Sequence, residues 1–373
     1  MTDAFDAARL ATPACAALRA YDPGHDLPAL RARFGTAIAE LGSNENVLGP
    51  SPRALAAMRA ALDDVYRYPD PRGAALKAAL ADRLGVTAQQ IALGNGSHEL
   101  LMMLAQCFAD AAHSVVYSRY SFAVYPIAAA AAGAAGIAMP ALPRTDARAP
   151  LGHDLAAMAA AVRADTRLIY LANPNNPTGT WFDDAALAAL LARVPREVLV
   201  VVDEAYHEYV DLPDLAGALP FTAQYPNLVV ARTFSKAHGL AGARVGYVVA
   251  DASVVAVLER MRESFNVNSL ALAAATAAVA DEAHLAAVRR YNSAARSWLV
   301  DELARRGYRC LPSQTNFVLL DLGRDAAPLE RHLLGEGVIV RPMGGYGLGQ
   351  TLRISIGRRD ENERLLAALD ALP

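Results

Sequence analysis

Short apolar runs that alternate with helical stretches constrain the fold of this 373-residue chain more than any other feature. Four of these runs, at 114–117, 167–172, 198–202 and 228–231, are dominated by Val, Leu and Ile. Nearly continuous apolar runs are typical of parallel strands buried on both faces, with the intervening helices as crossovers. A further strand at 245–250 is expected to be antiparallel, because too few residues precede it for a crossover helix. The sequence therefore predicts an α/β fold built on a large, mainly parallel sheet.

The pattern changes towards both ends of the chain. Residues 1–48 are dominated by turn-forming residues, so we expect an N-terminal arm that packs with a small domain. Residues 49–258 carry the strand and helix alternation and form the expected large domain. In residues 259–373 the helices lengthen and the strands are grouped differently, which predicts a smaller α+β domain at the C-terminus. Its longest helix is expected near 270–307, with a break inside it.

Composition excludes several classes of function. The net charge is −3 and no basic stripe occurs, so neither nucleic acid nor a membrane is an expected partner. The three cysteines lie far apart and no CxxC or HExxH motif is present, so we expect no disulfide framework and no metal site. The first residues lack the basic start and apolar core of a signal peptide, and runs such as 128–135 are too short to span a bilayer. We expect a soluble, cytoplasmic protein.

Lys236 is unusual because the chain has only two lysines among its 35 basic residues, the other being Lys77. It follows the 228–231 run, inside a turn rich in Ser and Gly. A lysine amine that its surroundings deprotonate can form a Schiff base with a carbonyl compound, which an arginine cannot. An average lysine of this kind is a solvated loop residue. Here the neighbouring residues instead favour Schiff-base chemistry with pyridoxal 5′-phosphate (PLP).

Polar residues follow the apolar runs at the ends of the predicted strands. In an open parallel sheet, ligands bind beyond these carboxyl ends, so Asn176, Asp203, Tyr206 and Lys236 are expected to converge. Asp203 can pair with the pyridine nitrogen of PLP, and Asn176 and Tyr206 can hydrogen-bond its phenolic oxygen. Lys236 can carry the Schiff base and move a proton. Lys236, Asp203 and Tyr206 are the expected catalytic residues.

A second group of residues is suited to hold a phosphate. Backbone N–H groups at Gly96 and Ser97, where a helix is predicted to begin, would face an anion. Side chains that can join them are Thr233, Ser235 and Arg244, which follow the 228–231 run.

Each candidate also has a simpler interpretation on its own. Tyr120 is expected to stack on the cofactor ring, but a lone tyrosine is more often a core residue. The segment Asn173–Gly179 alone would be read as a turn, Asp203 as a strand-end cap, and Arg244 as a surface ion pair. Because all of them occur in the right order and each lies at a strand end, chance is a poor explanation.

The motifs together resemble the histidinol-phosphate aminotransferase family of fold-type-I, class I/II PLP-dependent aminotransferases. The resemblance covers nearly the whole chain. The matching segments are Asn44–Pro50, Tyr68–Asp70, Gly94–Ser97, Asn173–Gly179, Asp203–Tyr206, Thr233–Arg244, Phe265–Asn268, Thr315–Val318, Val340–Arg341 and Leu352–Gly357.

This resemblance implies a mainly parallel, seven-stranded sheet in the large domain and a homodimer with shared active sites. It implies that Tyr68 reaches the PLP phosphate of the other subunit and that Arg353 binds the acidic group of the substrate. Further substrate-contacting positions are implied at Tyr21, Asn46, Asn316 and Arg341.

Two histidines depart from the family pattern. His98 is a cofactor-binding position where the family usually has an acidic or amide residue, and His238 stands where Phe is common. Because backbone donors supply much of the phosphate binding, the PLP site is expected to survive these changes. These two changes leave the identity of the substrate undecided.

The expected reaction is transfer of the amino group of L-histidinol phosphate to 2-oxoglutarate, which gives imidazole acetol phosphate and L-glutamate. An aromatic amino acid as donor is the alternative, and a PLP-dependent decarboxylase or lyase is a further one. A nucleotide-binding dehydrogenase is disfavoured because Glu99 replaces a glycine of the G-x-G-x-x-G motif after Gly94. A non-enzymatic binding protein would have no use for Lys236.

Overall fold

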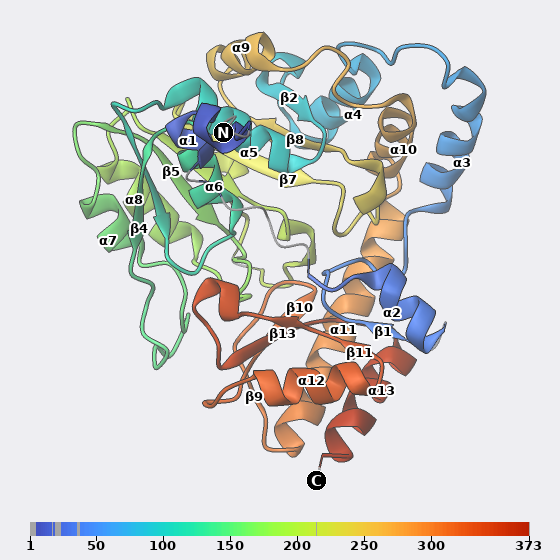
Figure 1. Ribbon diagram of the computed structural model, residues 1–373. Coiled ribbons are helices and arrows are strands. Elements are labelled where there is room, and N and C mark those ends of the chain that lie inside the picture. The colour runs from blue at the N-terminus through green and yellow to red at the C-terminus, as the bar shows by residue number, and fades with distance from the viewer. Residues whose placement is uncertain (1–4, 17, 19–23, 36–37, 214, 373) are drawn as a thin grey trace.

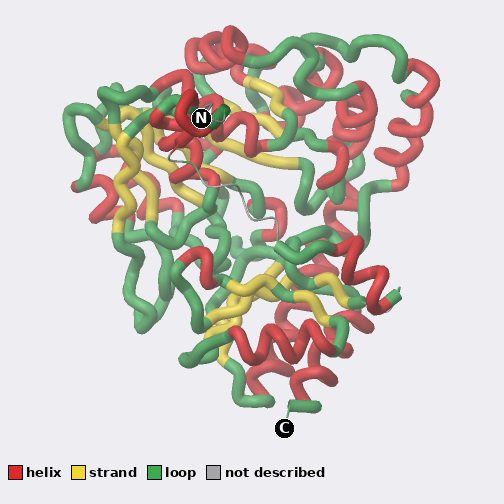
Figure 2. The backbone as a smooth tube through the Cα atoms, in the orientation of Figure 1, coloured by secondary structure: helices red, strands yellow, loops and turns green. Residues whose placement is uncertain are grey.

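The computed structural model describes residues 5–16, 18, 24–35, 38–213 and 215–372. The upper part in Figure 1 is built on a seven-stranded sheet, and the lower part is smaller and contains the C-terminus. Figure 2 shows the strands of these two parts as separate groups. In spatial order the large sheet consists of β2 (Ile91–Gly94), β8 (Gly246–Val249), β7 (Leu228–Thr233), β6 (Leu199–Asp203), β5 (Thr166–Ala172), β3 (Ser114–Ser118) and β4 (Ala135–Met139). Its neighbouring strands are parallel except for both pairs made by β8, as predicted.

Helices cover both faces of this sheet because its strands are apolar on both sides. On β5, Leu168 and Tyr170 pack on one face, and Ile169 and Leu171 pack on the other. The first face is covered by α5 (Ser97–Phe108), α6 (Val124–Ala131) and α9 (Ala252–Met261). The second is covered by α7 (Leu155–Ala160) and α8 (Asp184–Arg193), and over β2 and β8 by α3 (Pro52–Ala60), α4 (Ala74–Leu84) and α10 (Ser269–Val279).

The smaller part contains its own sheet and core. Helix α11 (Glu282–Arg305) leads into it from the larger part (Figure 1). Its other elements are β9 (Arg309–Cys310), β10 (Phe317–Asp321), α12 (Ala327–Gly335), β11 (Val338–Ile339), β12 (Arg341–Pro342), β13 (Thr351–Ser355) and α13 (Arg359–Asp370). The sheet order is β12-β13-β10-β9.

The N-terminal segment contributes a strand to this smaller part. It contains α1 (Pro13–Ala16), α2 (Leu27–Phe34) and β1 (Ala39–Glu40). Strand β1 pairs in parallel with β11, nearly 300 residues later in the chain. The chain then continues directly into the segment that lines the cavity described below.

The structure contains the break that was expected near 270–307 and one strand that was not expected. The break separates α10 from α11, because Asp281 caps α11 by accepting a hydrogen bond from the His284 backbone N–H. Helix α10 follows the expected boundary at 258/259, and its alanines pack in the cluster that contains residues of α3 and α4. Strand β4 was not expected, because Ala135–Met139 is an edge strand with exposed Ala and Gly instead of an apolar run.

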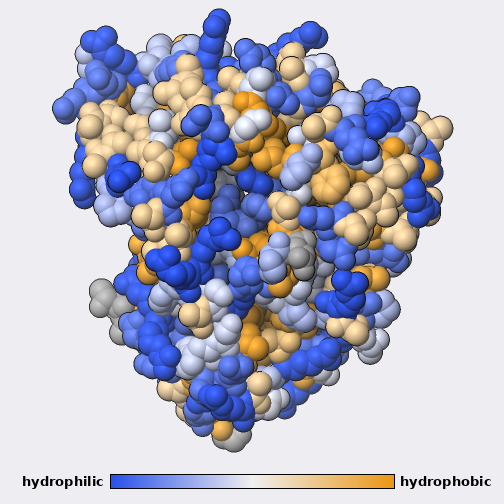
Figure 3. Space-filling view, turned by 180° about the vertical axis from the view of Figure 1, so that it is seen from behind, coloured by the Kyte–Doolittle hydropathy of each residue, from blue (hydrophilic) through white to orange (hydrophobic). Residues whose placement is uncertain are grey.

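Within the described ranges, no single helix is long and apolar enough to cross a membrane. Helices α10 and α11 meet that criterion only when they are taken together across an 80° bend. Seen from behind, the surface mixes hydrophobic and hydrophilic residues and is hollowed near the middle of the molecule (Figure 3).

Candidate active site

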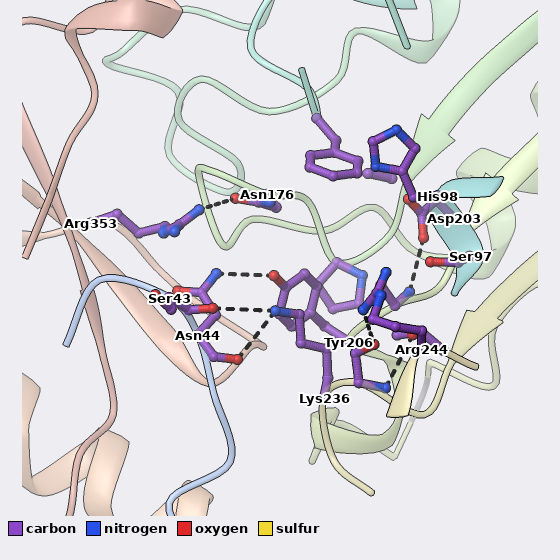
Figure 4. Close-up of a pocket in the computed structure, with 16 residues that line it drawn as sticks. Ser43, Asn44, Ser97, His98, Asn176, Asp203, Tyr206, Lys236, Arg244 and Arg353 are labelled. Carbon is purple, nitrogen blue, oxygen red and sulfur yellow. Dashed lines mark hydrogen bonds between the residues drawn. The ribbon is translucent and has the colours of Figure 1, made fainter. Parts of the chain in front are cut away.

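A cavity of about 200 Å³ lies where the parallel strands of the large sheet end. Its walls come from β-strand ends, the start of α5, strand β13, and Ser43 and Asn44 of the N-terminal segment. Ten residues selected from the sequence line it, namely Ser97, His98, Asn176, Asp203, Tyr206, Thr233, Ser235, Lys236, Arg244 and Arg353. Figure 4 shows Lys236 and Tyr206 near its centre.

The amine of Lys236 is held by backbone carbonyl groups. Its Nζ donates to the carbonyl oxygens of Ser43 (3.4 Å) and Asn44 (3.3 Å) and lies 5.6 Å from the centre of the Tyr206 ring. Burial, and after it the positive charge of Arg353, lowers the pKa of Lys236 to about 8. A substantial fraction of this amine is therefore neutral near pH 8, which the usual lysine pKa would not allow.

Asp203 is a buried carboxylate at the end of β6. Its Oδ2 accepts a hydrogen bond from the Tyr125 hydroxyl (2.9 Å), and its Oδ1 accepts one from the Ala205 backbone N–H (3.1 Å). Burial raises the pKa of Asp203 to about 6, although these two donors and Lys236 act in the opposite direction. The carboxylate is therefore suited to receive a cationic or N–H-bearing ligand group.

Tyr206 and Asn176 connect the cavity to Asn44 and Arg353. The Tyr206 hydroxyl accepts a hydrogen bond from Asn44 Nδ2 (3.0 Å), and burial raises the pKa of this tyrosine. Arg353 donates from Nη1 to Asn176 Oδ1 (2.7 Å) and from Nη2 to the carbonyl of Gly42 (2.7 Å). Arg353 thus places a cation in the wall of the cavity.

The start of α5 and Arg244 form a group of donors at the other side of the cavity (Figure 4). Gly96 caps α5 with φ +86°, and a Cβ added there would collide with the Arg244 guanidinium, so glycine lets Arg244 lie against the turn. Arg244 Nη1 lies 3.4 Å from Ser235 Oγ and donates to the Ala241 carbonyl (2.9 Å). These groups and the α5 N-terminus favour a bound anion.

Comparisons with known proteins identify the family. The sequence model of aminotransferase class I and II matches residues 36–369. The chain belongs to this aminotransferase family.

Similar proteins cover the full length of this aminotransferase. It is 50% identical to histidinol-phosphate aminotransferase 2 of Pseudomonas aeruginosa over 363 residues, 96% of either chain. It is 48% identical to histidinol-phosphate aminotransferase 2 of Methylococcus capsulatus, over 97% of each. A crystal structure of histidinol-phosphate aminotransferase from Sinorhizobium meliloti, in complex with pyridoxal-5′-phosphate, superposes with a TM-score of 0.88. It is 33% identical, and the match covers 99% of this chain and 98% of that one.

One aromatic residue expected in the cavity of the aminotransferase lies elsewhere. Tyr120 packs in an apolar cluster that includes Leu311 and Met343, and Phe122 lines the cavity instead. Phe122 is therefore the aromatic residue of this loop that lines the cavity, and the ring-stacking role of Tyr120 stays a prediction.

Other expected contacts lie behind the cavity wall. Asn46 Nδ2 donates to the carbonyl of Ala237, next to Lys236 (2.9 Å). Asn316 Nδ2 donates to the carbonyls of Asn44 and Glu45 (3.1 Å each). Both asparagines therefore support residues near the amine of Lys236, and neither lines the cavity.

Two further expected positions, Arg341 and Tyr68, lie outside the cavity lining. Arg341, on β12, lies against Gly24 and outside the cavity lining. Tyr68 is 82% exposed and stacks on Phe265 with ring centres 4.6 Å apart. Tyr21 lies outside the described residues.

His98 lines the cavity, and burial, followed by the charge of Arg244, lowers its pKa, so it is neutral near pH 7. His238 lines a different cavity and packs against Phe234. Sequence reasoning missed the cavity residues Ser43, Asn44 and Phe122. Asn44 begins one of the segments that resemble the family, and that segment was the available signal.

Proposed function

We propose that the chain is a PLP-dependent aminotransferase that transfers the amino group of L-histidinol phosphate to 2-oxoglutarate. The products are imidazole acetol phosphate and L-glutamate. The observation that carries this proposal is the single cavity in which Lys236, Asp203 and Arg353 meet an anion-binding helix start. The names of the relatives and of the PLP-bound structural neighbour support it.

The cavity residues fit PLP at each of its polar groups. The phosphate would be held where the α5 N-terminus meets Arg244, an approach that the missing Cβ of Gly96 allows. The side chains that would bind it there are Ser97, His98, Thr233, Ser235 and Arg244. Asp203 would pair with the ring nitrogen.

At the other end of the ring, Tyr206 and Asn176 would bond the phenolic oxygen, and Lys236 would bind the aldehyde. Phe122 and Ala205 offer apolar surface to the ring. When bound, PLP supplies an aldehyde that combines with a primary amine and a ring that withdraws electrons from the adjacent carbon.

The chain's own residues supply the proton transfer and the binding of the acidic group. The Lys236 amine, with its pKa lowered to about 8, can accept a proton and return it. Arg353 has the fork geometry that suits a phosphate or a carboxylate, so one residue would serve both histidinol phosphate and 2-oxoglutarate. Arg341, Asn316, Asn46 and Tyr21 are proposed as further substrate positions.

A single-turnover absorbance experiment tests the proposal. The protein loaded with PLP is mixed separately with L-histidinol phosphate, phenylalanine and tyrosine, and the cofactor band is followed. Rapid conversion by histidinol phosphate alone is expected. Faster conversion by an aromatic amino acid would change the substrate to an aromatic donor, and release of carbon dioxide without a keto product would indicate a decarboxylase.

Lys236→Ala is the matched test of the cofactor proposal, and Lys77→Ala is its control. Lys77 is the other lysine of the chain and pairs with Glu259 (2.7 Å), away from the cavity. We expect Lys236→Ala to lose at least about 10⁴-fold in kcat and to lack the cofactor band of a lysine adduct, while Lys77→Ala keeps both. A Lys236→Ala protein with wild-type turnover would refute the mechanism.

We also propose a cytoplasmic homodimer with active sites completed across the interface. A group of exposed apolar side chains, in which Tyr68 stacks on Phe265, supports a second copy as partner, because contiguous exposed apolar patches are uncommon on monomers. They are Leu62, Val65, Tyr66, Tyr68, Met261 and Phe265. Sedimentation is expected to show twice the mass of the chain. Tyr68→Phe is expected to weaken PLP binding, because Tyr68 would reach the phosphate in the other subunit.

A further inference from the structure

A buried phenol contacts the carboxylate that would face the PLP ring nitrogen. Tyr125 is fully buried, and its hydroxyl donates to Asp203 Oδ2 at 2.9 Å. Burial, and after it the charge of Asp203, raises the pKa of Tyr125 well above its usual value. The phenol therefore keeps its proton at every working pH and can act only as a donor towards Asp203.

The surroundings fix this phenol in place. The ring of Tyr125 stacks on Tyr170, with centres 4.8 Å apart and planes 4° apart. The Tyr170 hydroxyl in turn donates to the backbone carbonyl of Leu101 on α5 (2.7 Å). Phe122 meets the Tyr125 ring edge-on at 6.0 Å. Because these contacts hold the ring, they keep the hydroxyl oxygen beside Asp203.

The same turn of chain also supplies the cavity wall. Phe122 lines the cavity and lies just before α6, and its backbone carbonyl accepts a hydrogen bond from the Tyr125 N–H (3.1 Å). One short segment therefore sets both the apolar wall and the donor to the carboxylate.

The groups that face Asp203 do not replace this donor. Tyr170 on β5 has its hydroxyl committed to Leu101. Glu204, the next residue, disfavours ionisation of Asp203, and the charge of Lys236 favours it. The Ala205 backbone N–H bonds the other oxygen, Oδ1. Tyr125 is thus the side-chain donor that the structure provides to the ionised carboxylate, within the described part of the chain.

We propose that Tyr125 is a positioning residue that keeps the Asp203 carboxylate ionised and oriented towards the ring nitrogen of PLP. This inference rests on the proposed function, because it needs PLP as the ligand. It concerns residues 125 and 203 of this chain and adds a role that the cavity lining does not reveal, since Tyr125 lies behind the wall.

The first test compares Tyr125→Phe with Tyr170→Phe in the full-length protein. Both changes remove one fully buried hydroxyl from a stacked pair, but only Tyr125 bonds to Asp203. Hydrogen bonds to charged groups are the stronger kind, so we expect Tyr125→Phe to raise the dissociation constant of PLP at least about tenfold. As the pH is lowered, the Tyr125→Phe variant should also lose PLP binding at a higher pH than the wild type does, because its Asp203 is protonated more easily. Tyr170→Phe is expected to change the constant less than about threefold.

The second test uses a PLP analogue in which a C–H replaces the ring nitrogen. This analogue offers nothing for the ionised Asp203 to accept, so Tyr125→Phe should weaken its binding less than about twofold. Equal losses for PLP and the analogue would overturn the proposal and leave Tyr125 with a packing role.

A third test compares Asp203→Asn with the double variant Asp203→Asn/Tyr125→Phe, so it does not require the Tyr125→Phe single variant to fold. In an Asp203→Asn background, adding Tyr125→Phe is expected to leave PLP binding unchanged, and a further loss of fivefold or more would overturn the inference. Failure of the wild-type protein to bind PLP would instead refute the proposed function. Wild-type binding with equal effects of Tyr125→Phe and Tyr170→Phe would refute only the role of Tyr125.

Discussion

Asp203 and Glu204 are consecutive residues with opposite surroundings. Both are buried, at 5% and 0% exposure. Successive strand residues point to opposite faces of a sheet, so Asp203 faces the cavity and Glu204 faces the other side. Asp203 accepts from two neutral donors, Tyr125 and Ala205. Glu204 accepts two bonds from the Arg232 guanidinium (2.9 and 2.7 Å) and one from the Ala218 N–H (2.6 Å).

The two carboxylates therefore differ in their pKa shifts although both are buried. Burial raises the pKa of Asp203 to about 6. Burial also acts to raise the pKa of Glu204, but the charges of Arg232 and His207 outweigh it and lower this pKa. Glu204 has its countercharge inside the protein, whereas the countercharge of Asp203 is proposed to arrive with the cofactor. A stabilising carboxylate and a ligand-binding one can thus be told apart by the partners that the fold provides.

The largest effect is expected from Asp203→Asn. This change keeps the shape of the side chain but removes the charge proposed to pair with the ring nitrogen. We expect kcat/KM with histidinol phosphate and 2-oxoglutarate to fall about 10³-fold, with an unchanged circular dichroism spectrum. A loss smaller than tenfold would contradict the role of Asp203 as the ligand-binding carboxylate.

Glu204→Gln should show the reverse pattern. It leaves the buried Arg232 charge without its carboxylate, so we expect a loss of about 3–5 kcal/mol in the free energy of unfolding. Activity per folded molecule should stay within about threefold of the wild type. Denaturant unfolding measures the first quantity and active-site titration the second. The double variant Glu204→Gln/Arg232→Met is the control and should recover part of the lost stability.

The pH dependence of the cofactor-free protein sharpens the comparison further. The folded pKa of Asp203, about 6, lies above its unfolded value, so the folded state holds more protons between these two values. Ionisation of Asp203 therefore reduces stability as the pH rises, and the reduction is complete above pH 6. As the pH rises from 4 to 7, we expect the free energy of unfolding of Asp203→Asn to gain up to about 3 kcal/mol over that of the wild type, measured by denaturant unfolding.

Glu204, with its lowered pKa, contributes stability that is lost as the pH falls, and Asp203→Asn should leave this loss unchanged. A constant difference between the two proteins across this range would contradict the assignment.

The smallest effect is expected from Arg232→Lys. Lysine keeps the charge but lacks the planar guanidinium whose Nε and Nη2 both donate to Glu204 Oε2, so we expect a loss of about 1–2 kcal/mol in stability. Activity should be unaffected. A loss as large as that of Glu204→Gln would mean that geometry, rather than charge, dominates this pair.

Much of the site could be predicted because parallel strands end at one edge of a sheet. That rule alone brought Asp203, Lys236 and Asn176 together from positions up to 60 residues apart in the sequence. The rule can be applied to a sequence because buried parallel strands are recognisable as apolar runs. The antiparallel β8 followed from the short connection before it.

Loop direction and long-range contacts could not be predicted in this way. Tyr120 and Phe122 are two aromatic residues in one loop, and only the path of the chain before α6 decides which enters the cavity. Tyr125 carried no signal beyond membership of a helix, because its partner Asp203 is 78 residues away. Asn44 has φ +56°, and its place beside Tyr206 depends on β1 pairing with β11.

The pairing of β1 with β11 has a consequence for synthesis of the chain on the ribosome. Strand β1 is made nearly 300 residues before its partner residues Val338 and Ile339. Domains generally fold as units while the chain is still growing, so the large sheet, complete at Val249, can form first. The carbonyls of Ser43 and Asn44, which hold the Lys236 amine, are anchored by β1 just before them. The nascent protein would therefore acquire its finished lysine site only after Val338 and Ile339 have been made, about 100 residues after Lys236 itself.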